Sequence, residues 1–390
     1  MIKIFFWVFT FIVLYAYIGY GILLFLLVRV QYLLRGTKKN QQEETNFFPH
    51  VTLIIPAFNE EDFIRQKIEN TLSLEYPVDK LQVIFITDGS SDRTPEIVAT
   101  YNQFTLMHSD ERKGKVAAMN RAMNVVKTPY VIFCDANTLL NVEAIKEIVK
   151  HYTNKKVGGV AGEKKVLSES TNSSEGGEGL YWKYESTLKR LDSEFYTVVG
   201  AAGELFSFRT ELYDTVEEDT LLDDFIISLR ICQKGYRVVY EKKAYAMEKA
   251  SSNIQEEQKR KIRISAGAFQ SMLRLIEILN VFRYPKLSFQ YISHRVLRWA
   301  ICPFVLPLIF FLNYLLLNER HVIYYMLFVC QIVFYLFAFL GWKLSKFKRL
   351  SGFLNFPFYF VFMNVSLYMG LARFIKGNQS VIWEKAKRNV

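Results

Sequence analysis

Cysteine is scarce in this chain and follows no pattern. Four of the 390 residues are cysteine, and they are widely separated: Cys134, Cys232, Cys302 and Cys330. None has the short spacing to a second ligand that is typical of a zinc site. We therefore expect four reduced thiols with a structural role, and neither a metal centre built on cysteine nor a disulfide framework.

Charge is missing from residues 4–28, and this stretch is long enough to cross a bilayer as a helix. Three further apolar stretches, 299–317, 322–341 and 353–372, have a similar character. The first stretch is too long for the apolar region of a signal peptide, and no small-x-small cleavage site follows it. The sequence therefore predicts a multi-pass protein of the cell membrane, held by a signal anchor and by further C-terminal membrane segments.

Basic residues flank the first apolar stretch unequally. One lysine precedes it, whereas four basic residues follow it: Arg29, Arg35, Lys38 and Lys39. The positive-inside rule then predicts that the central domain faces the cytoplasm. Four spans would leave the basic C-terminal tail outside, against the same rule. One of the proline-containing segments, 299–317 or 353–372, is therefore a candidate for a re-entrant or interfacial position.

A basic patch laced with aromatic residues is also missing, although the net charge is +11. Nucleic-acid-binding domains concentrate basic residues on one face or along one helix. Here most of the excess lies beside the apolar stretches, so attraction to anionic lipid headgroups is the simpler explanation. We expect membrane lipids as partners and no nucleic acid.

Between the apolar ends, strand and helix patterns alternate. The predicted strands are 51–56, 81–87, 104–108 and 130–134, and the predicted helices are 61–74, 93–101, 115–126 and 142–152. Such alternation is typical of an α/β domain with a mostly parallel sheet. Beyond it we expect a strand at 157–162, a polar loop at 168–179, helices at 180–193 and about 220–233, and short strands within 236–248.

These patterns divide the chain into six parts. We expect an anchor (1–30), a polar linker (31–46), the α/β domain (47–285), an amphipathic helix (286–298), about three C-terminal membrane segments (299–372) and a basic tail (373–390). The amphipathic helix suits the membrane interface, although packing on the core of the domain is the alternative.

Acidic side chains follow the predicted strands in order. Asn59-Glu60 ends the first strand, Asp88 the second, and Asp135-Ala136-Asn137 the fourth, while Asp223-Asp224 comes about ninety residues later. Ligands of open α/β sheets bind beyond the carboxyl ends of the strands. Carboxylates at that edge can hold a metal or a ribose, or accept a proton, so the sequence predicts an active site for a nucleotide-bearing substrate.

This series of motifs, between Phe47 and Phe282, resembles the inverting family 2 glycosyltransferases with a GT-A fold. The flanking membrane segments make it similar to polysaccharide synthases, such as those for cellulose, hyaluronan or poly-N-acetylglucosamine. The resemblance implies a membrane-anchored hexosyltransferase that moves a sugar from a nucleotide diphosphate, most readily UDP, to a growing glycan or lipid-linked acceptor in cell-envelope or exopolysaccharide synthesis. Two alternatives stay open: a single-addition transferase onto a polyprenyl-phosphate lipid, and an inactive scaffold or transport subunit.

The resemblance also implies roles on the donor side. Five residues would line the nucleotide site: Ala57, Glu60, Asp88, Lys115 and Asp135. Asp135 and Asn137 stand where the family carries its Asp-x-Asp metal motif, and Mg²⁺ or Mn²⁺ would neutralise the diphosphate there. Asn137 departs from that motif, because its amide oxygen can coordinate a hard cation but brings no charge. We therefore expect a divalent cation that can be weakly bound.

On the acceptor side, Asp224 matches the family's general base, with Asp223 beside it. Gly200, Gly203 and Glu204 match the acceptor-side turn. Arg263 stands where processive synthases carry the arginine of Gln-x-x-Arg-Trp, and it would pair with the departing diphosphate. The glutamine and the tryptophan of that motif are absent, so the resemblance leaves open whether the enzyme is processive.

Overall fold

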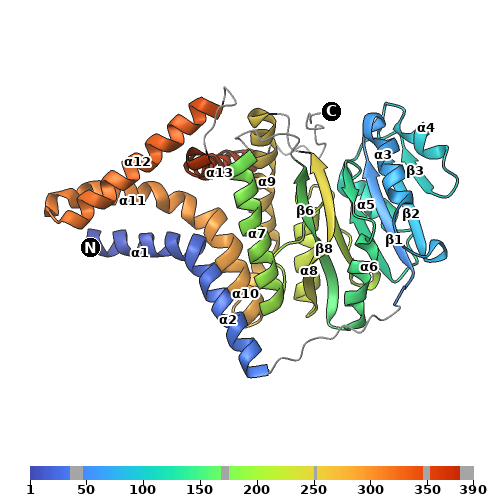
Figure 1. Ribbon diagram of the computed structural model, residues 1–390, viewed down its shortest axis with the longest axis horizontal. Helices are drawn as coiled ribbons and strands as arrows, with labels where there is room; N and C mark the ends of the chain where they lie inside the picture. The colour runs from blue at the N-terminus through green and yellow to red at the C-terminus, as the bar shows by residue number, and fades with distance from the viewer. Residues whose placement is uncertain (36–46, 168–174, 250–252, 346–351, 378–390) are drawn as a thin grey trace.

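The computed structural model describes residues 1–35, 47–167, 175–249, 253–345 and 352–377. Its core is an eight-stranded sheet with the order β3-β2-β1-β4-β7-β6-β8-β5. Four of the seven strand pairings are parallel and three are antiparallel. The sheet is therefore mixed, with a parallel half at one end and an antiparallel half next to the long helices (Figure 1).

The parallel half consists of β1 (Val51–Ala57), β2 (Leu81–Asp88), β3 (Thr105–Ser109) and β4 (Tyr130–Cys134). Strands β1 and β4 are almost fully buried on both faces, as their continuous apolar runs predict. The connections carry the helices α3 (Glu61–Leu72), α4 (Thr94–Ala99) and α5 (Lys115–Met123), and α6 (Ala144–Val149) follows β5. These strands and helices confirm the predicted α/β alternation, with ends shifted by a few residues.

The antiparallel half contains β5 (Thr138–Leu140), β6 (Val157–Leu167), β7 (Leu205–Arg209) and β8 (Arg237–Lys249). Here two predictions were wrong. The short strands expected within 236–248 form the single 13-residue strand β8, which is held because β6 pairs with it along most of its length. The loop expected at 168–179 ends earlier, because α7 already begins at Glu175; residues 168–174 lie outside the described residues.

Three long helices border this half of the sheet: α7 (Glu175–Phe195), α8 (Asp223–Gln233) and α9 (Ile254–Arg274). In Figure 1, α7 and α9 lie between the sheet and the apolar helices. Helix α13 (Gly352–Ile375) packs against both of them, and α2 (Tyr20–Arg35) packs against α7. The helices α7 and α9 therefore connect the sheet to the apolar part of the chain.

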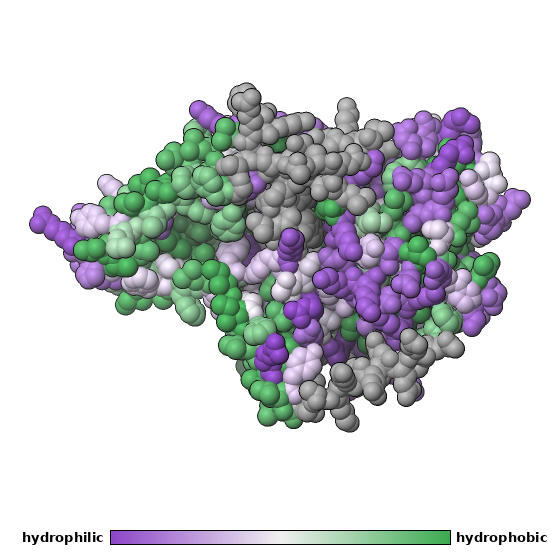
Figure 2. All heavy atoms as spheres, in the orientation of Figure 1, coloured by the Kyte–Doolittle hydropathy of each residue, from purple (hydrophilic) through white to green (hydrophobic). Residues whose placement is uncertain are grey.

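Within the described residues, four helical segments are long and apolar enough to cross a membrane: Ile2–Leu34, Pro285–Glu319, Val322–Ser345 and Phe353–Ile375. The first contains α1 (Ile2–Leu14), a π-helical turn (Tyr15–Gly19) and α2. The second contains α10 (Pro285–Tyr291), the π-helical segment η6 (Ile292–Ile301) and α11 (Cys302–Leu316), and the third is α12 (Val322–Ser345). The expected amphipathic helix 286–298 is thus continuous with a candidate span. Figure 2 shows hydrophobic residues over α1, α11 and α12 and hydrophilic residues over the sheet.

Short 3₁₀ turns complete the described elements: Val78–Lys80, Lys150–Thr153, Thr210–Leu212, Ile276–Leu279 and Leu317–Glu319.

A buried layer of charged side chains joins α7 to η6. The carboxylate of Glu185 accepts hydrogen bonds from Arg298 at 2.7 Å and from Arg295 at 3.2 Å, and it lies 3.3 Å from Nε2 of His294. The other ring nitrogen of His294 lies 2.6 Å from Asp192, which is two turns further along α7 than Glu185. Charges buried this deeply need such partners. The layer therefore fixes the sheet domain to the apolar helices in one position.

Candidate active site

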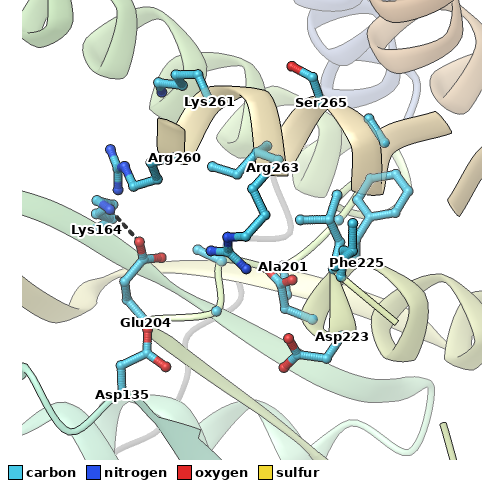
Figure 3. Close-up of a pocket in the computed structure, with 18 of the residues that line it drawn as sticks. Asp135, Lys164, Ala201, Glu204, Asp223, Phe225, Arg260, Lys261, Arg263 and Ser265 are labelled. Carbon is cyan, nitrogen blue, oxygen red and sulfur yellow. Dashed lines mark hydrogen bonds and ion pairs between the residues drawn. The ribbon is translucent and has the colours of Figure 1, made fainter. Parts of the chain in front are cut away.

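A cavity of about 290 Å³ lies between the carboxyl ends of the strands and the helices α7, α8, α9 and α13. Its polar lining includes residues from the sheet domain and from the long helices beside it: Lys115, Asp135, Asn137, Lys164, Lys189, Glu204, Asp223, Asp224, Arg260 and Arg263. In Figure 3, Arg263 reaches down from α9 toward Glu204 and Asp223, and Arg260 lies beside Lys164. A small second cavity adjoins at Lys115 and is lined by Ala57 and Asp88. The position at the ends of the strands is where ligands of open α/β sheets bind.

Asp88 ends β2 and is held by backbone amides. Lys113 and Gly114 donate from their N–H groups to Oδ2 of Asp88, at 3.0 and 2.6 Å. Its Oδ1 is buried and has no hydrogen-bond partner among the described residues. A buried oxygen without a partner is costly. The second cavity thus presents one oriented acceptor to a ligand that can donate a hydrogen bond.

Lys115 begins α5 and joins the acidic residues of two motifs. Its ammonium lies 2.9 Å from Asp135 and 3.5 Å from Asp223. Burial opposes the charge of Lys115, but the two carboxylates outweigh burial and raise its pKa. Burial also raises the pKa of Asp135, although Lys115 acts against this. The three charged groups therefore lie close together, and the ammonium of Lys115 neutralises only part of the negative charge of Asp135 and Asp223.

Asp135 and Asn137 lie in the turn between β4 and β5. Oδ1 of Asn137 is buried without a hydrogen-bond partner among the described residues. No group of three or more histidine, cysteine or acidic side chains in the described part of the chain could by itself hold a metal. Mg²⁺, however, is commonly bound by one or two carboxylates together with substrate phosphates and water. These two side chains fit a site of that kind, in which the substrate completes the coordination.

Asp223 and Asp224 form the first turn of α8, where the helix dipole favours negative charge. Burial raises the pKa of Asp224 to about 7, and the adjacent Asp223 adds to the shift. A carboxylate with a pKa near neutrality can accept a proton efficiently. A Cβ added to Gly203 would lie 3.5 Å from Asp224, so the acceptor-side turn approaches this carboxylate closely.

The acceptor-side turn has a backbone that needs glycine. Gly200 has a φ of +90°, and a Cβ there would come within 2.2 Å of the ring of Phe225. Glu204 ends the turn in an ion pair with Lys164, which also pairs with Glu248 (Figure 3). Burial would disfavour the charge of Glu204, but Lys164 outweighs burial and holds the pKa of that carboxyl well below its usual range. Glu204 is thus a fixed anion beside the cavity.

The structure brings together most of the residues that the sequence singled out. Nine line the main cavity: Lys115, Asp135, Asn137, Gly200, Gly203, Glu204, Asp223, Asp224 and Arg263. Ala57 and Asp88 line the adjoining cavity. Glu60 is not among the described residues that line either one. It is buried at the start of α3, where its backbone N–H donates to Thr94 at 2.8 Å.

Several lining residues were missed by the sequence analysis. The basic ones are Lys164, Lys189, Arg260, Lys261 and Arg295, and the apolar ones include Trp299, Met363 and Leu367. They come from β6, α7, α9, η6 and α13, so no contiguous motif contains them. One sequence pattern could have pointed to Lys189. Glu185, Lys189 and Asp192 have the spacing i, i+4, i+7, which puts three charges on one face of α7. Such a face is ordinarily solvated, but here it is buried.

The mixed sheet with an acidic site at its strand ends defines a domain of the GT-A glycosyltransferase type. Comparison with known proteins agrees: residues 52–216 match the model of glycosyl transferase family 2. This part of the chain is therefore similar to the family 2 glycosyltransferases.

Curated relatives and a solved structure extend the comparison. The chain is 25% identical over 243 residues to poly-beta-1,6-N-acetyl-D-glucosamine synthase of Staphylococcus aureus, a match that covers 60% of this chain and 58% of the relative. The synthase of Staphylococcus epidermidis is 24% identical over 245 residues, again with 58% of its length covered. A mannosyltransferase from Pyrobaculum calidifontis, solved with GDP-Man and Mn²⁺, has a TM-score of 0.71 at 21% identity and covers 96% of this chain and 99% of its own. The shared fold thus includes the apolar helices.

Proposed function

We propose that this protein is an inverting glycosyltransferase that moves a sugar from a nucleotide-diphosphate donor to the hydroxyl of a glycan or lipid-linked acceptor. The observation that carries the proposal is the convergence of Asp88, Asp135 and Asp224 on two adjoining cavities at the strand ends. The family match and the likeness to polysaccharide synthases support the same reaction class.

The donor side would bind the nucleotide. The free Oδ1 of Asp88 is suited to accept a hydrogen bond from a base or ribose, and Ala57 lines the same cavity. Lys115 stands at the N-terminus of α5, a position that favours phosphate. We expect UDP as the nucleotide, as the resemblance to polysaccharide synthases implies, whereas the mannosyltransferase neighbour holds GDP-Man.

Asp135 and Asn137 would hold Mg²⁺ or Mn²⁺ together with the donor's phosphates. When bound, the cation would supply positive charge to the diphosphate leaving group. Mn²⁺ in the mannosyltransferase neighbour is consistent with this assignment. Lys115 must then share Asp135 with the cation, since its ammonium is now 2.9 Å from that carboxylate.

Asp224 would act as the general base. It accepts the proton of the acceptor hydroxyl, whose oxygen bonds to the anomeric carbon while the bond from that carbon to the diphosphate oxygen breaks. Its pKa of about 7 suits this proton transfer at physiological pH. Asp223 helps to raise that pKa, and Arg263, half-buried beside the acidic cluster, would pair with the departing diphosphate. Gly200, Gly203 and Glu204 would shape the acceptor side.

We further infer that the protein is embedded in the cell membrane, with the sheet domain in the cytoplasm. The four apolar helices and the basic residues after the first of them support this orientation. A reporter fused after residue 45 should be accessible only from the cytoplasm. A reporter that is labelled from outside intact cells would contradict the orientation and the access to nucleotide sugars.

The test of the proposed function is a panel of nucleotide sugars incubated with the full chain in native-like lipid, with released nucleoside diphosphate as the readout. We expect release from one donor or a few related ones, and none after Asp135→Ala. If no nucleotide sugar is consumed and no nucleoside diphosphate binds, the domain is a scaffold with the fold of a transferase, and the proposal fails.

A further inference from the structure

Lys67 of α3 is a lysine that is completely buried inside the sheet domain. The residue is 0% exposed, and its ammonium donates hydrogen bonds to the backbone carbonyl of Thr138 at 2.8 Å and to Sγ of Cys134 at 2.9 Å. Among the described residues, no carboxylate forms an ion pair with it. Lysine is almost never fully buried without such a pair, because burial of its charge is costly. Stability of the core alone therefore does not explain the lysine.

The two acceptors of Lys67 flank the turn that carries the proposed cation ligands. Cys134 is the last residue of β4, Thr138 is the first residue of β5, and Asp135-Ala136-Asn137 is the turn between them. Thr138 also closes this turn from within, because its backbone N–H and its hydroxyl both donate to the carbonyl of Asp135, at 3.4 and 2.9 Å. One buried ammonium thus joins the two ends of the turn.

The side chains of the turn depend on its backbone for their direction. Lys115 holds the carboxylate of Asp135 at 2.9 Å, whereas Oδ1 of Asn137 is buried without a hydrogen-bond partner among the described residues. The backbone between β4 and β5 therefore sets where this oxygen lies. Groups that orient metal ligands from behind typically change the affinity for the metal when they are lost. Lys67 lies in such a place.

We propose that Lys67 is a positioning residue of the cation site: by joining Cys134 to Thr138, it fixes the turn that presents Asp135 and Asn137 to Mg²⁺ or Mn²⁺. The inference rests on the proposed function and adds to it a residue outside the cavities, since Lys67 is not among the described residues that line either one. The charge of Lys67 would by itself repel a cation. The proposal therefore assigns its effect to the geometry of the turn.

The test measures, by calorimetry, the binding of Mn²⁺ to the full chain in lipid nanodiscs at saturating UDP, or at saturating GDP if GDP binds more tightly. Lys67→Met keeps the length of the side chain but removes its charge and both hydrogen bonds. This variant should bind Mn²⁺ about 10- to 100-fold more weakly than the wild type. Binding of the nucleotide without Mn²⁺ should stay unchanged, because the adjoining cavity with Ala57 and Asp88 is not altered.

The matched control is Asn70→Ala on the same helix. Asn70 also joins α3 to β5, since its side chain exchanges two hydrogen bonds of 2.8 Å with the backbone of Leu140, at the far end of β5 from the turn. This variant should unfold at a lower temperature and bind Mn²⁺ as the wild type does. A second pair keeps Lys67: Cys134→Ala removes one acceptor and should weaken Mn²⁺ binding, whereas Cys134→Ser retains an acceptor and should not.

Nucleotide binding separates failure of this inference from failure of the proposed function. If the wild type binds neither UDP nor GDP, the proposed function fails, and the inference falls with it. If nucleotide binds and Lys67→Met binds Mn²⁺ at least as tightly as the wild type, the inference alone is wrong. Equal weakening in Lys67→Met and Asn70→Ala would mean a general structural role and would also contradict it. If Lys67→Met does not fold, the Cys134 variants decide, and equal Mn²⁺ affinity in those two would overturn the inference.

Discussion

The donor side and the acceptor side of the site are built in different ways. On the donor side, Asp88 and Asp135 lie at the ends of β2 and β4, in the parallel half of the sheet, and are fixed by nearby backbone amides or by Lys115. At the acceptor end, the charges sit on β6, α7, α9 and η6, and most cancel in buried ion pairs, such as that of Lys164 with Glu204. The strand ends position groups through the backbone, whereas the helices position them through side-chain pairs. The second arrangement is more sensitive to the loss of one partner.

The largest effect is expected at the donor end. Asp135→Ala removes the carboxylate of the proposed cation site and leaves Lys115 with one carboxylate fewer. Stabilisation of a diphosphate leaving group by a cation is worth several kcal/mol. The rate of sugar transfer should therefore fall by about 10³-fold or more. Steady-state release of nucleoside diphosphate at saturating Mg²⁺ measures this, and an unchanged rate in the variant or after chelation would refute a cation site at Asp135.

Stability should be most sensitive at the acceptor end. Glu185→Gln leaves Arg295 and Arg298 buried without their carboxylate. Breaking a buried pair in this way typically costs about 3–5 kcal/mol. The matched control is Glu194→Gln on the same helix, because within the described part of the chain Glu194 pairs with the half-exposed Arg190 alone and should contribute less than about 1 kcal/mol. Thermal unfolding of the purified variants compares the two, and equal losses would mean that the buried layer does not hold the domains together.

The pH dependence should report the base at the acceptor end. Since the pKa of Asp224 is about 7, the carboxylate becomes protonated, and inactive as a base, as the pH falls below that value. The value of kcat/KM should therefore decrease about tenfold for each pH unit below 7. When donor and cation are bound, the acidic limb of the pH profile of kcat should lie at lower pH than that of kcat/KM. A profile of kcat/KM that stays flat between about pH 5.5 and 7.5 would contradict the assignment of Asp224.

The donor end could be predicted from the sequence because its residues follow apolar strands directly. Asp88 and Asp135 each come at or just after the end of such a run, and parallel strands bring their carboxyl ends to one edge. Glu60 comes three residues after β1, at the start of a helix, and it is not among the described residues that line either cavity, so its predicted role stays a prediction. Helix and strand ends were predicted within a few residues, since apolar periodicity fixes the middle of an element better than its ends.

The acceptor end could not be predicted in the same way. Lys189 and Arg295 are far apart in sequence, and only the packing of α7 against η6 brings them together. A lysine on a helix is ordinarily solvated, so its residue type alone does not predict burial. The same holds for α7 itself: the glycine-rich run after Glu175 predicts a loop, yet the helix includes it, because tertiary packing can override propensity.

The most direct test of the account compares Asp88→Ala with Asp224→Asn. Calorimetry with nucleoside diphosphate and Mg²⁺ is run beside a transfer assay on both variants. Asp88→Ala should weaken nucleotide binding by about 10- to 100-fold, because it removes a charged hydrogen-bond acceptor. Asp224→Asn should bind nucleotide as tightly as the wild type and transfer sugar about 10²–10⁴-fold more slowly. Near wild-type transfer by Asp224→Asn would contradict the account, and would make Asp223, or an acceptor that needs no base, the next explanation.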